Sequence, residues 1–186
     1  AITIAQNLKG IANVSLFEKS QGVGGRMALR RSGPYEFDHG AQFFTAKSKH
    51  FKDFIAPLIK INVIQQWNGR FAEFKDNKIL RRINWDSEYP HYVGVPGMNS
   101  IPKYLSKNLN IKSNIKVNKI IKNTTNGWNL FDDNLNNLGE YDWVISTAPA
   151  IQSAEILPKC FKYQNVLKNK KMVGCFSLML GFTNAL

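Results

Sequence analysis

The residues best suited to chemistry stand close together near the start of the sequence: an acid, a glycine-dense loop and an arginine. Glu18 follows the apolar run 14–17, and the loop 20–25 leads to Arg26. A carboxylate at the end of a strand can accept hydrogen bonds from both hydroxyls of a ribose diol. Glycines let a backbone approach a pyrophosphate, and an arginine donates to phosphate oxygens. Residues of these types in this order indicate a dinucleotide-binding site.

The elements that must position this site can be predicted from local patterns. Apolar residues at helical spacing predict a helix over residues 1–9, and the run 13–18 predicts a strand. A helix that leads into a strand with an acidic tip is the second half of a βαβ nucleotide-binding unit. The glycine turn of such a unit is expected roughly 20 residues before the acid. We therefore expect the sequence to begin inside that motif, with Ala1 at its last position. The alternative is that Glu18 merely ends an ordinary strand.

The middle of the sequence alternates between helical and strand patterns. Residues 22–31 are expected to form a loop and residues 35–38 a short strand. Ser48 fits the N-cap of a helix that runs to about Lys60. Alternation between residues 61 and 95, interrupted by turn signals, predicts a β meander. In that meander three aromatic residues either line a pocket or fill a core, namely Trp67, Trp85 and Tyr92.

The remaining sequence begins with a helix and is then mostly β. The helix is predicted over residues 97–109, capped by Asn99 or Ser100 and with its apolar residues inward, namely Ile101, Tyr104, Leu105 and Leu109. An Asn-Gly turn signal at 126–127 separates the first two of the later strands. The predicted strands cover residues 115–121, 128–131, 141–146 and 173–182, and helical turns are expected at 151–157.

The motifs resemble those of the FAD-dependent amine oxidases, and more closely those of their renalase-like bacterial branch. Residues 17–28 and 37–45 carry most of the resemblance, and residues 92–98 and 144–150 follow in the same order. The resemblance implies an α/β fold, in which an FAD/NAD(P)-binding Rossmann-like domain is interleaved with a β-rich substrate domain. Because members of that branch are much longer, it also implies that this sequence is truncated at both ends.

The resemblance divides the sequence between two domains and assigns site residues. The FAD-binding domain would comprise residues 1–47 and 97–150, and the substrate domain residues 48–96 and 151–186. Gln42 and His39 are candidates for catalysis, although a single histidine in a turn is more often structural. Several cofactor-binding positions also have a purely structural interpretation: Lys19 can point to solvent, Phe43 can pack in a core, and Val117 can be an ordinary strand residue. The implied cofactor-binding residues are Glu18, Lys19, Gly24, Gly25, Arg26, Gly40, Ala41, Gln42, Phe43, Val117, Thr147 and Ala148.

The activity implied by the resemblance is that of an FAD-dependent oxidoreductase. A hydride would pass from an amine or a dihydronicotinamide-type substrate to flavin N5, and O2 would reoxidise the flavin to give H2O2. The renalase-like branch acts on misreduced isomers of NAD(P)H, so a reduced nicotinamide dinucleotide is one candidate substrate. We expect the 186 residues alone to bind FAD poorly and to be inactive, because the opening glycine turn is missing.

Composition limits the alternatives. The sequence is 44% hydrophobic and 20% charged, which is typical of a globular domain, and its net charge is +12. A basic binding module for nucleic acid or acidic partners is therefore an alternative to the enzyme, as is an inactive fragment of the flavoenzyme. The lysines are scattered rather than gathered into one stripe, so we expect no nucleic-acid partner.

The remaining expectations concern metals, membranes and compartment. His50 and His91 have no acidic or cysteine partners at ligand spacing, so no metal site is expected. No apolar stretch approaches ~18 residues and the first residues lack the pattern of a signal peptide, so no membrane partner is expected. Cys160 and Cys175 stand in apolar surroundings outside any CxxC motif and are predicted to be reduced core residues of a cytoplasmic protein.

Overall fold

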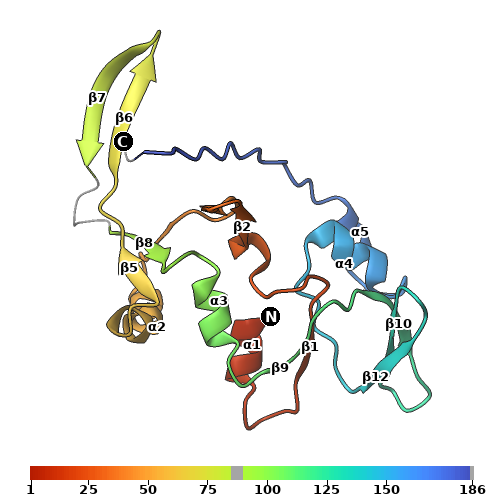
Figure 1. Ribbon diagram of the computed structural model, residues 1–186. Helices are drawn as coiled ribbons and strands as arrows, with labels where there is room; N and C mark the ends of the chain where they lie inside the picture. Colours follow the sequence, from red (N-terminus) through yellow and green to blue (C-terminus); the bar gives the residue numbers. More distant parts are fainter. Residues whose placement is uncertain (85–89, 185–186) are drawn as a thin grey trace. The chain divides into compact units, whose positions relative to one another are not determined.

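The computed structural model describes residues 1–84 and 90–184, and the chain divides into two compact units (Figure 1). The first unit comprises Ala1–Gly22 and Asn108–Phe176, and the second comprises Val23–Lys107 and Ser177–Leu186. Both units mix helices with small sheets, as expected for the α/β class. The predicted division into a cofactor domain and a substrate domain stays a prediction.

The first unit contains a parallel strand pair, an antiparallel sheet and three helices. Strand β1 pairs in parallel with β9, with Ser15 opposite Asn110 and Phe17 opposite Lys112. The antiparallel sheet has the order β10-β11-β12. The elements of this unit are α1 (Ile2–Asn7), β1 (Ser15–Phe17), β9 (Asn110–Lys112), β10 (Val117–Lys122), β11 (Trp128–Asp132), β12 (Asn137–Tyr141), α4 (Ala150–Ile156) and α5 (Gln164–Lys168).

Local hydrogen bonds define the two turns of this antiparallel sheet. Asn126 has φ +64° between β10 and β11, and the Gly127 N–H donates to the Asn123 side chain over 2.6 Å. Between β11 and β12, the Asp132 carboxylate accepts hydrogen bonds from the backbone and side chain of Asn136. These bonds, the side-chain one foremost, lower the pKa of Asp132 below its ordinary value. The predicted Asn-Gly turn is confirmed.

The second unit is built from two hairpins, a three-stranded sheet and two α-helices. Strand β8 lies in the middle of the sheet, between β4 and β5, and β2–β3 and β6–β7 are the hairpins. The elements of this unit are η1 (Gly25–Met27), β2 (Leu29–Ser32), β3 (Tyr35–Asp38), β4 (Phe44–Thr45), α2 (Lys49–Lys60), β5 (Ile64–Gln66), β6 (Arg70–Lys75), β7 (Lys78–Asn84), β8 (His91–Gly94) and α3 (Ser100–Leu105).

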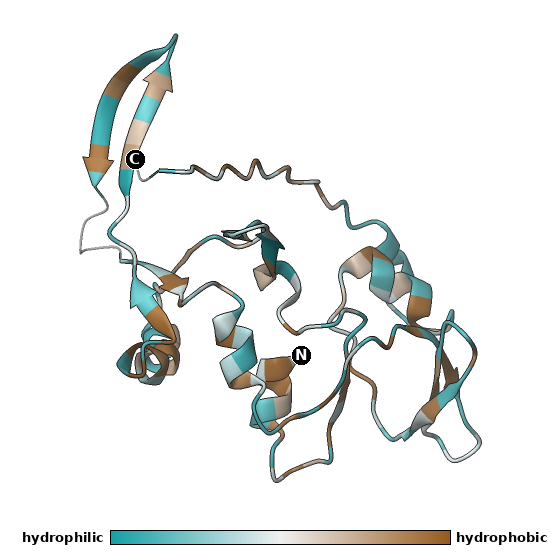
Figure 2. Ribbon diagram, in the orientation of Figure 1, coloured by the Kyte–Doolittle hydropathy of each residue, from teal (hydrophilic) through white to brown (hydrophobic). Residues whose placement is uncertain are grey.

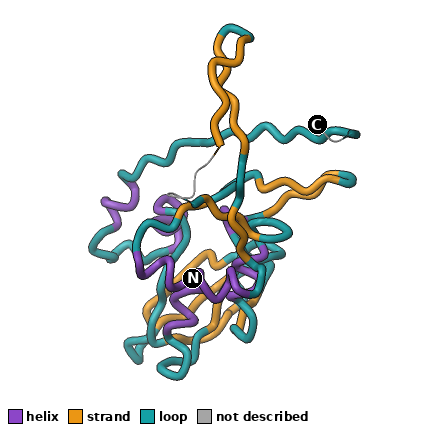
Figure 3. Tube along the Cα trace, turned by 90° about the vertical axis from the view of Figure 1, so that its left-hand side faces the viewer, coloured by secondary structure: helices purple, strands orange, loops and turns teal. Residues whose placement is uncertain are grey.

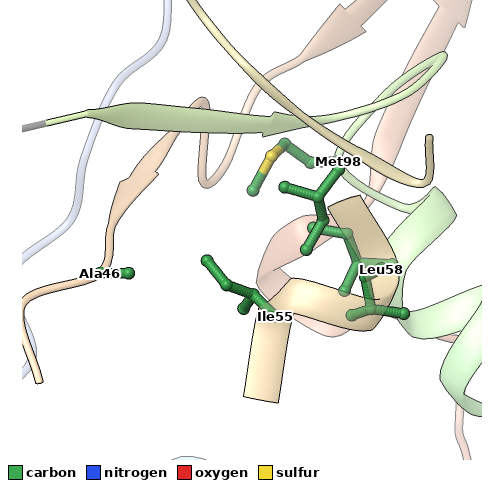
Figure 4. Packing of buried hydrophobic residues seen from close by; sticks show 6 residues of the cluster. Ala46, Ile55, Leu58 and Met98 are labelled. Carbon is green, nitrogen blue, oxygen red and sulfur yellow. The ribbon is translucent and has the colours of Figure 1, made fainter. Parts of the chain in front are cut away.

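The core of the second unit lies between α2, α3 and the β4-β8-β5 sheet. Helix α2 begins after Ser48, whose hydroxyl accepts a hydrogen bond from the Phe51 N–H at 3.2 Å, so the predicted N-cap is confirmed. Ile64 and Met98 are 0% and 1% exposed, and the buried face of α2 packs around them (Figure 4). Burying a side chain of this size contributes about 1.5–3 kcal/mol. The buried residues of this core are Ala46, Ile55, Leu58, Ile64, Met98 and Ile101.

The predicted strand over residues 173–182 is wrong. These residues lie outside every helix and strand, as the teal tube leading to the C-terminus shows (Figure 3). Val173 and Phe176 are 94% and 101% exposed, and hydrophobic residues along the segment are visible in Figure 2. A strand needs a neighbour to pair its N–H and C=O groups, and no described strand takes that place. Apolar alternation alone therefore did not produce a strand.

Several smaller predictions are also wrong. The stretch 22–31 is not all loop, because η1 and most of β2 lie in it. The strand predicted over 141–146 is wrong beyond Tyr141, because β12 covers Asn137–Tyr141 and its pairing with β11 ends where Tyr141 meets Trp128. Cys160 and Cys175 are free thiols but are exposed, not buried in a core.

The aromatic residues of the middle region differ in their environment. Trp67 is exposed, and Tyr104 is exposed rather than inward. Tyr92 packs against the core of the second unit, as one of the two interpretations expected. Trp85 lies outside the described residues.

Candidate functional site

Glu18 directly follows β1 and is held by backbone hydrogen bonds. Its N–H donates to the Lys112 carbonyl and its carbonyl accepts from the Ile115 N–H, each at 3.0 Å. One carboxylate oxygen, Oε1, accepts a hydrogen bond from the Ser20 N–H at 2.8 Å. The other oxygen, Oε2, has no hydrogen-bond partner within the described part of the chain. The backbone around this half-buried acid is therefore fixed, while one carboxylate oxygen can still accept hydrogen bonds.

Four more predicted site residues lie in the first unit with Glu18. Lys19 is exposed, and its ammonium donates to the Gln152 side chain of α4 at 3.3 Å. Val117 is half-buried and begins β10. Thr147 and Ala148 lie in the exposed segment before α4. The Ala148 carbonyl accepts a hydrogen bond from the buried Ser153 hydroxyl at 2.9 Å, which fixes this segment to α4.

The glycine loop continues in the second unit and turns through two positive φ angles. Gly24 has φ +128° and Gly25 has φ +52°, conformations that L side chains rarely adopt. The single turn η1 follows, with the Met27 N–H donating to the Gly24 carbonyl at 2.9 Å. Among the described residues, no acceptor receives the N–H of Val23 or Gly24, and no partner engages the exposed guanidinium of Arg26. The loop therefore presents several unused donors.

The two motifs singled out in the sequence pack directly against each other. The Ala41 N–H donates to the Arg26 carbonyl at 2.8 Å. Gly40 lies so close to this carbonyl that a Cβ at position 40 would fall well inside contact distance of its oxygen. A Cβ added at Gly24 would, in turn, lie only 3.3 Å from the Pro102 side chain of α3. Both glycines are therefore needed for close backbone packing, which a side chain would disturb.

Asp38 ends β3 and connects it to the segment that leads into α3. Both carboxylate oxygens lie at hydrogen-bond distance from the Met98 N–H, at 3.0 and 3.1 Å. Burial raises the pKa of Asp38 above its ordinary value, and the hydrogen bond from Met98 offsets part of this rise. Asp38 lies in the stretch 37–45 that carries part of the resemblance, and its carboxylate accepts a hydrogen bond from the backbone.

Gln42, His39 and Phe43 belong to the same stretch as Asp38 but differ in their environments. Gln42 is exposed, and its amide has no hydrogen bond among the described residues. His39 is also exposed, and its backbone carbonyl accepts from the Ser177 hydroxyl at 2.6 Å. The Phe43 ring packs against the rings of His91 and Trp67, with centroids 5.2 and 6.0 Å away. Phe43 therefore belongs to an aromatic cluster, and its own side chain is partly exposed.

The structure brings together only part of the predicted set within each unit. Gly24, Gly25 and Arg26 lie beside Gly40 and Ala41 in the second unit. Glu18 and its neighbours belong to the first unit, and the division falls between Gly22 and Val23. Within residues 1–84 and 90–184, no group of three or more His, Cys, Asp or Glu side chains could hold a metal ion.

Sequence reasoning did not single out a group of polar residues between the β2–β3 hairpin and α3. Arg31, Ser100, Lys103 and Lys107 line a groove there. The available signal was the short spacing of Lys103, on α3, and Lys107, in the turn after it. From the sequence alone, the lysines had been interpreted only as scattered charges.

Comparison with known families finds a match for the first part of the chain. Residues 1–58 match the family described as an NAD(P)-binding Rossmann-like domain. This matched stretch includes Glu18, the glycine loop, Gly40 and most of α2. The family is a dinucleotide-binding domain that is found in FAD-dependent enzymes and is typical of oxidoreductases. In addition, none of the helices in the described residues has the length and apolar character needed to cross a membrane.

Proposed function

We propose that this protein is an FAD-dependent oxidoreductase in which Glu18 binds the adenosine ribose of the cofactor. The observation that carries the proposal is the environment of the Glu18 carboxylate. Glu18 follows a strand in a parallel pair, and hydrogen bonds hold its backbone N–H and carbonyl. One of its carboxylate oxygens has no hydrogen-bond partner among the described residues. In open α/β sheets, ligands bind at the carboxyl ends of such strands. The family match over residues 1–58 supports the same reading.

The donors of the glycine loop suit the phosphates of the cofactor. The N–H groups of Val23 and Gly24 and the guanidinium of Arg26 are unused within the described residues. A pyrophosphate carries negative charge on oxygens that accept such bonds, and an arginine can meet two of them at once. These residues therefore fit the chemistry of the group that they would hold.

The remaining positions would complete the cofactor site as the resemblance implies. Gly40 and Ala41 would leave room for the flavin, and Gln42 would donate a hydrogen bond to it from its exposed amide. Lys19, Phe43, Val117, Thr147 and Ala148 would border the rest of the cofactor. The FAD-binding domain would comprise residues 1–47 and 97–150, and residues 48–96 and 151–186 would form the substrate domain.

If bound, FAD would supply two-electron redox chemistry, in which the two electrons and two protons removed from the substrate would reduce O2 to H2O2. The protein's own residues would orient the donor and exclude water from it. The candidate substrate is an amine or a reduced nicotinamide dinucleotide, and the net charge of +12 would favour the latter because it carries phosphates. The imidazole of His39 is exposed, and its catalytic role stays a prediction.

The test is to titrate the 186-residue protein with FAD and to measure binding by the change in flavin fluorescence. A parallel titration uses NAD⁺. We expect weak but saturable FAD binding and weaker NAD⁺ binding. Glu18→Gln keeps the shape of the side chain but loses the charge, so it should weaken FAD binding about tenfold.

The matched control is Glu155→Gln, which removes the charge of an exposed glutamate on α4 and should leave binding unchanged. Equal affinity of the wild type and Glu18→Gln for FAD would contradict the ribose assignment. Tighter binding of NAD⁺ than of FAD would contradict the choice of cofactor.

A further inference from the structure

The second unit contains a groove that shares no residue with the proposed cofactor site. It lies between the β2–β3 hairpin and the polar face of α3, and its volume is about 330 Å³. Helix α3 and strand β2, which contribute lining residues, are labelled in Figure 1. The residues that line it are Leu29, Arg31, Glu36, Val63, Pro96, Asn99, Ser100, Lys103, Tyr104 and Lys107.

Three cations and one anion line the groove. Arg31 donates from Nε to Glu36 at 2.6 Å, which orients the guanidinium and neutralises the carboxylate. The terminal nitrogens of Arg31 make no hydrogen bond among the described residues, and neither Lys103 nor Lys107 is in an ion pair there. With Glu36 balanced by Arg31, Lys103 and Lys107 leave two net positive charges. This balance matches a dianion such as a phosphate monoester.

The same groove offers an apolar floor and neutral polar groups. Leu29, Val63 and Pro96 line it with hydrocarbon, and the Tyr104 ring has the Lys107 ammonium 4.8 Å from its centroid. The side chain of Asn99 makes no cap hydrogen bond to α3 and no other hydrogen bond among the described residues. A flat organic ring can therefore cover apolar surface here while an attached anion meets the cations.

The helix pattern explains why these groups gather on one side. Ser100, Lys103 and Tyr104 lie three and four residues apart on one face of α3, and Lys107 follows in the turn after the helix. The opposite face carries Ile101, which is buried in the core of this unit. Core packing thus fixes the rotation of α3 and directs its polar face to the hairpin.

We propose that this groove binds a mononucleotide, with the phosphate held by Arg31, Lys103 and Lys107 and the base against the apolar floor. Its volume is at the lower end of the range of about 300–1,000 Å³ for ligand sites, which suits one nucleotide rather than a dinucleotide. This site does not depend on the cofactor assignment, because none of its residues is in the cofactor set.

The test uses thymidine 5′-monophosphate, because this probe lacks the ribose diol that Glu18 would bind. The full 186-residue protein is titrated by calorimetry with the nucleotide, with thymidine and with inorganic phosphate. We expect one site per chain, with binding of thymidine and of phosphate each at least tenfold weaker than that of the nucleotide. Raising the ionic strength should weaken nucleotide binding further.

Two variants test the residues that hold the phosphate. Lys103→Gln and Lys107→Gln each remove one exposed charge without breaking an ion pair of the described chain, so both should fold. Each should weaken nucleotide binding about tenfold. Lys52→Gln, at an exposed position of α2, is the matched control and should bind as the wild type does.

Different results separate this proposal from the cofactor proposal. Absence of saturable nucleotide binding, or unchanged binding in Lys103→Gln and Lys107→Gln, would overturn it. Equal binding of thymidine and its monophosphate would also overturn it, because the cations would then have no role. Glu18→Gln should not alter binding of this probe, and a loss of binding in that variant would move the nucleotide to the Glu18 site.

Discussion

Two acids end strands in this protein, and their surroundings put them to different uses. Asp38 ends β3, and the Met98 N–H bonds its carboxylate across 60 positions of sequence. Glu18 follows β1, and only its neighbour Ser20 donates to its carboxylate among the described residues. Both acids lie in stretches that carry the family resemblance, but only Glu18 was assigned to the cofactor. The comparison indicates that a carboxylate with an unused oxygen can bind a ligand, whereas a carboxylate that accepts a hydrogen bond from a distant backbone N–H stabilises the fold.

The largest expected effect concerns the glycines beside the two acids. Gly40→Ala should lower the free energy of unfolding by about 3 kcal/mol, because the added Cβ meets the Arg26 carbonyl. Gly22→Ala is the matched change on the Glu18 side, where no atom lies within 4 Å of an added Cβ. It should change stability by less than about 0.5 kcal/mol.

The measurement for this pair is urea unfolding followed by circular dichroism. If Gly40→Ala were as stable as Gly22→Ala, the packing of the two motifs against each other would be wrong, and the contrast between the two strand ends would lose its main support.

The next effect comes from the acids themselves. Asp38→Ala leaves the Met98 N–H without its acceptor and should lower the free energy of unfolding by about 2 kcal/mol. Glu18→Ala removes an acceptor whose only described donor is the N–H of exposed Ser20, so we expect a loss below about 1 kcal/mol. Thermal unfolding of the two variants beside the wild type compares them directly. Equal losses would show that Glu18 is as much a structural acid as Asp38.

A smaller effect should appear in the pH dependence of stability. Because burial raises the pKa of Asp38, the folded protein binds this proton more tightly than the unfolded chain, whose value is 3.8. The resulting stabilisation is complete below pH 3.8 and is lost as the pH rises through the raised pKa. The wild type should therefore lose stability relative to Asp38→Asn as the pH increases across this interval.

This pH effect is measured as the difference in the free energy of unfolding between wild type and Asp38→Asn, from about pH 3 to about pH 7. Asp132 works in the opposite direction, since its lowered pKa gives stability that is lost at low pH. Asp132 is present in both proteins, so its contribution cancels in the difference. A difference that grows in favour of the wild type with rising pH would contradict the role of burial at Asp38.

Local features of the fold could be predicted from the sequence, whereas the long-range ones could not. The Ser48 cap and the Asn126 turn depend on neighbours within a few residues, so composition and spacing identify them. The bond between Asp38 and Met98 depends on where the chain returns after 60 residues, and no local pattern contains that information. The exposed run 173–182 shows the same limit, because a strand also requires a partner.

The candidate site likewise has features that could be predicted from the sequence and features that could not. The acid and the glycine loop were predicted because the chemistry of a nucleotide imposes residue types at short spacing, and residues 1–58 match a dinucleotide-binding family. The structural use of Asp38 was missed because an acid in a motif looks alike whether a ligand or a backbone N–H meets it. The groove beside α3 was missed because its walls come from segments far apart in sequence.

The central claim is that Glu18 recognises a ribose diol, and the most direct test compares adenosine with 2′-deoxyadenosine. Saturation-transfer NMR on the 186-residue protein measures such weak binding, and neither nucleoside has the phosphate that the α3 groove would need. We predict that the wild type prefers adenosine by about tenfold and that Glu18→Gln binds both nucleosides equally weakly. A wild-type protein without this preference, or a Glu18→Gln variant that keeps it, would contradict the account.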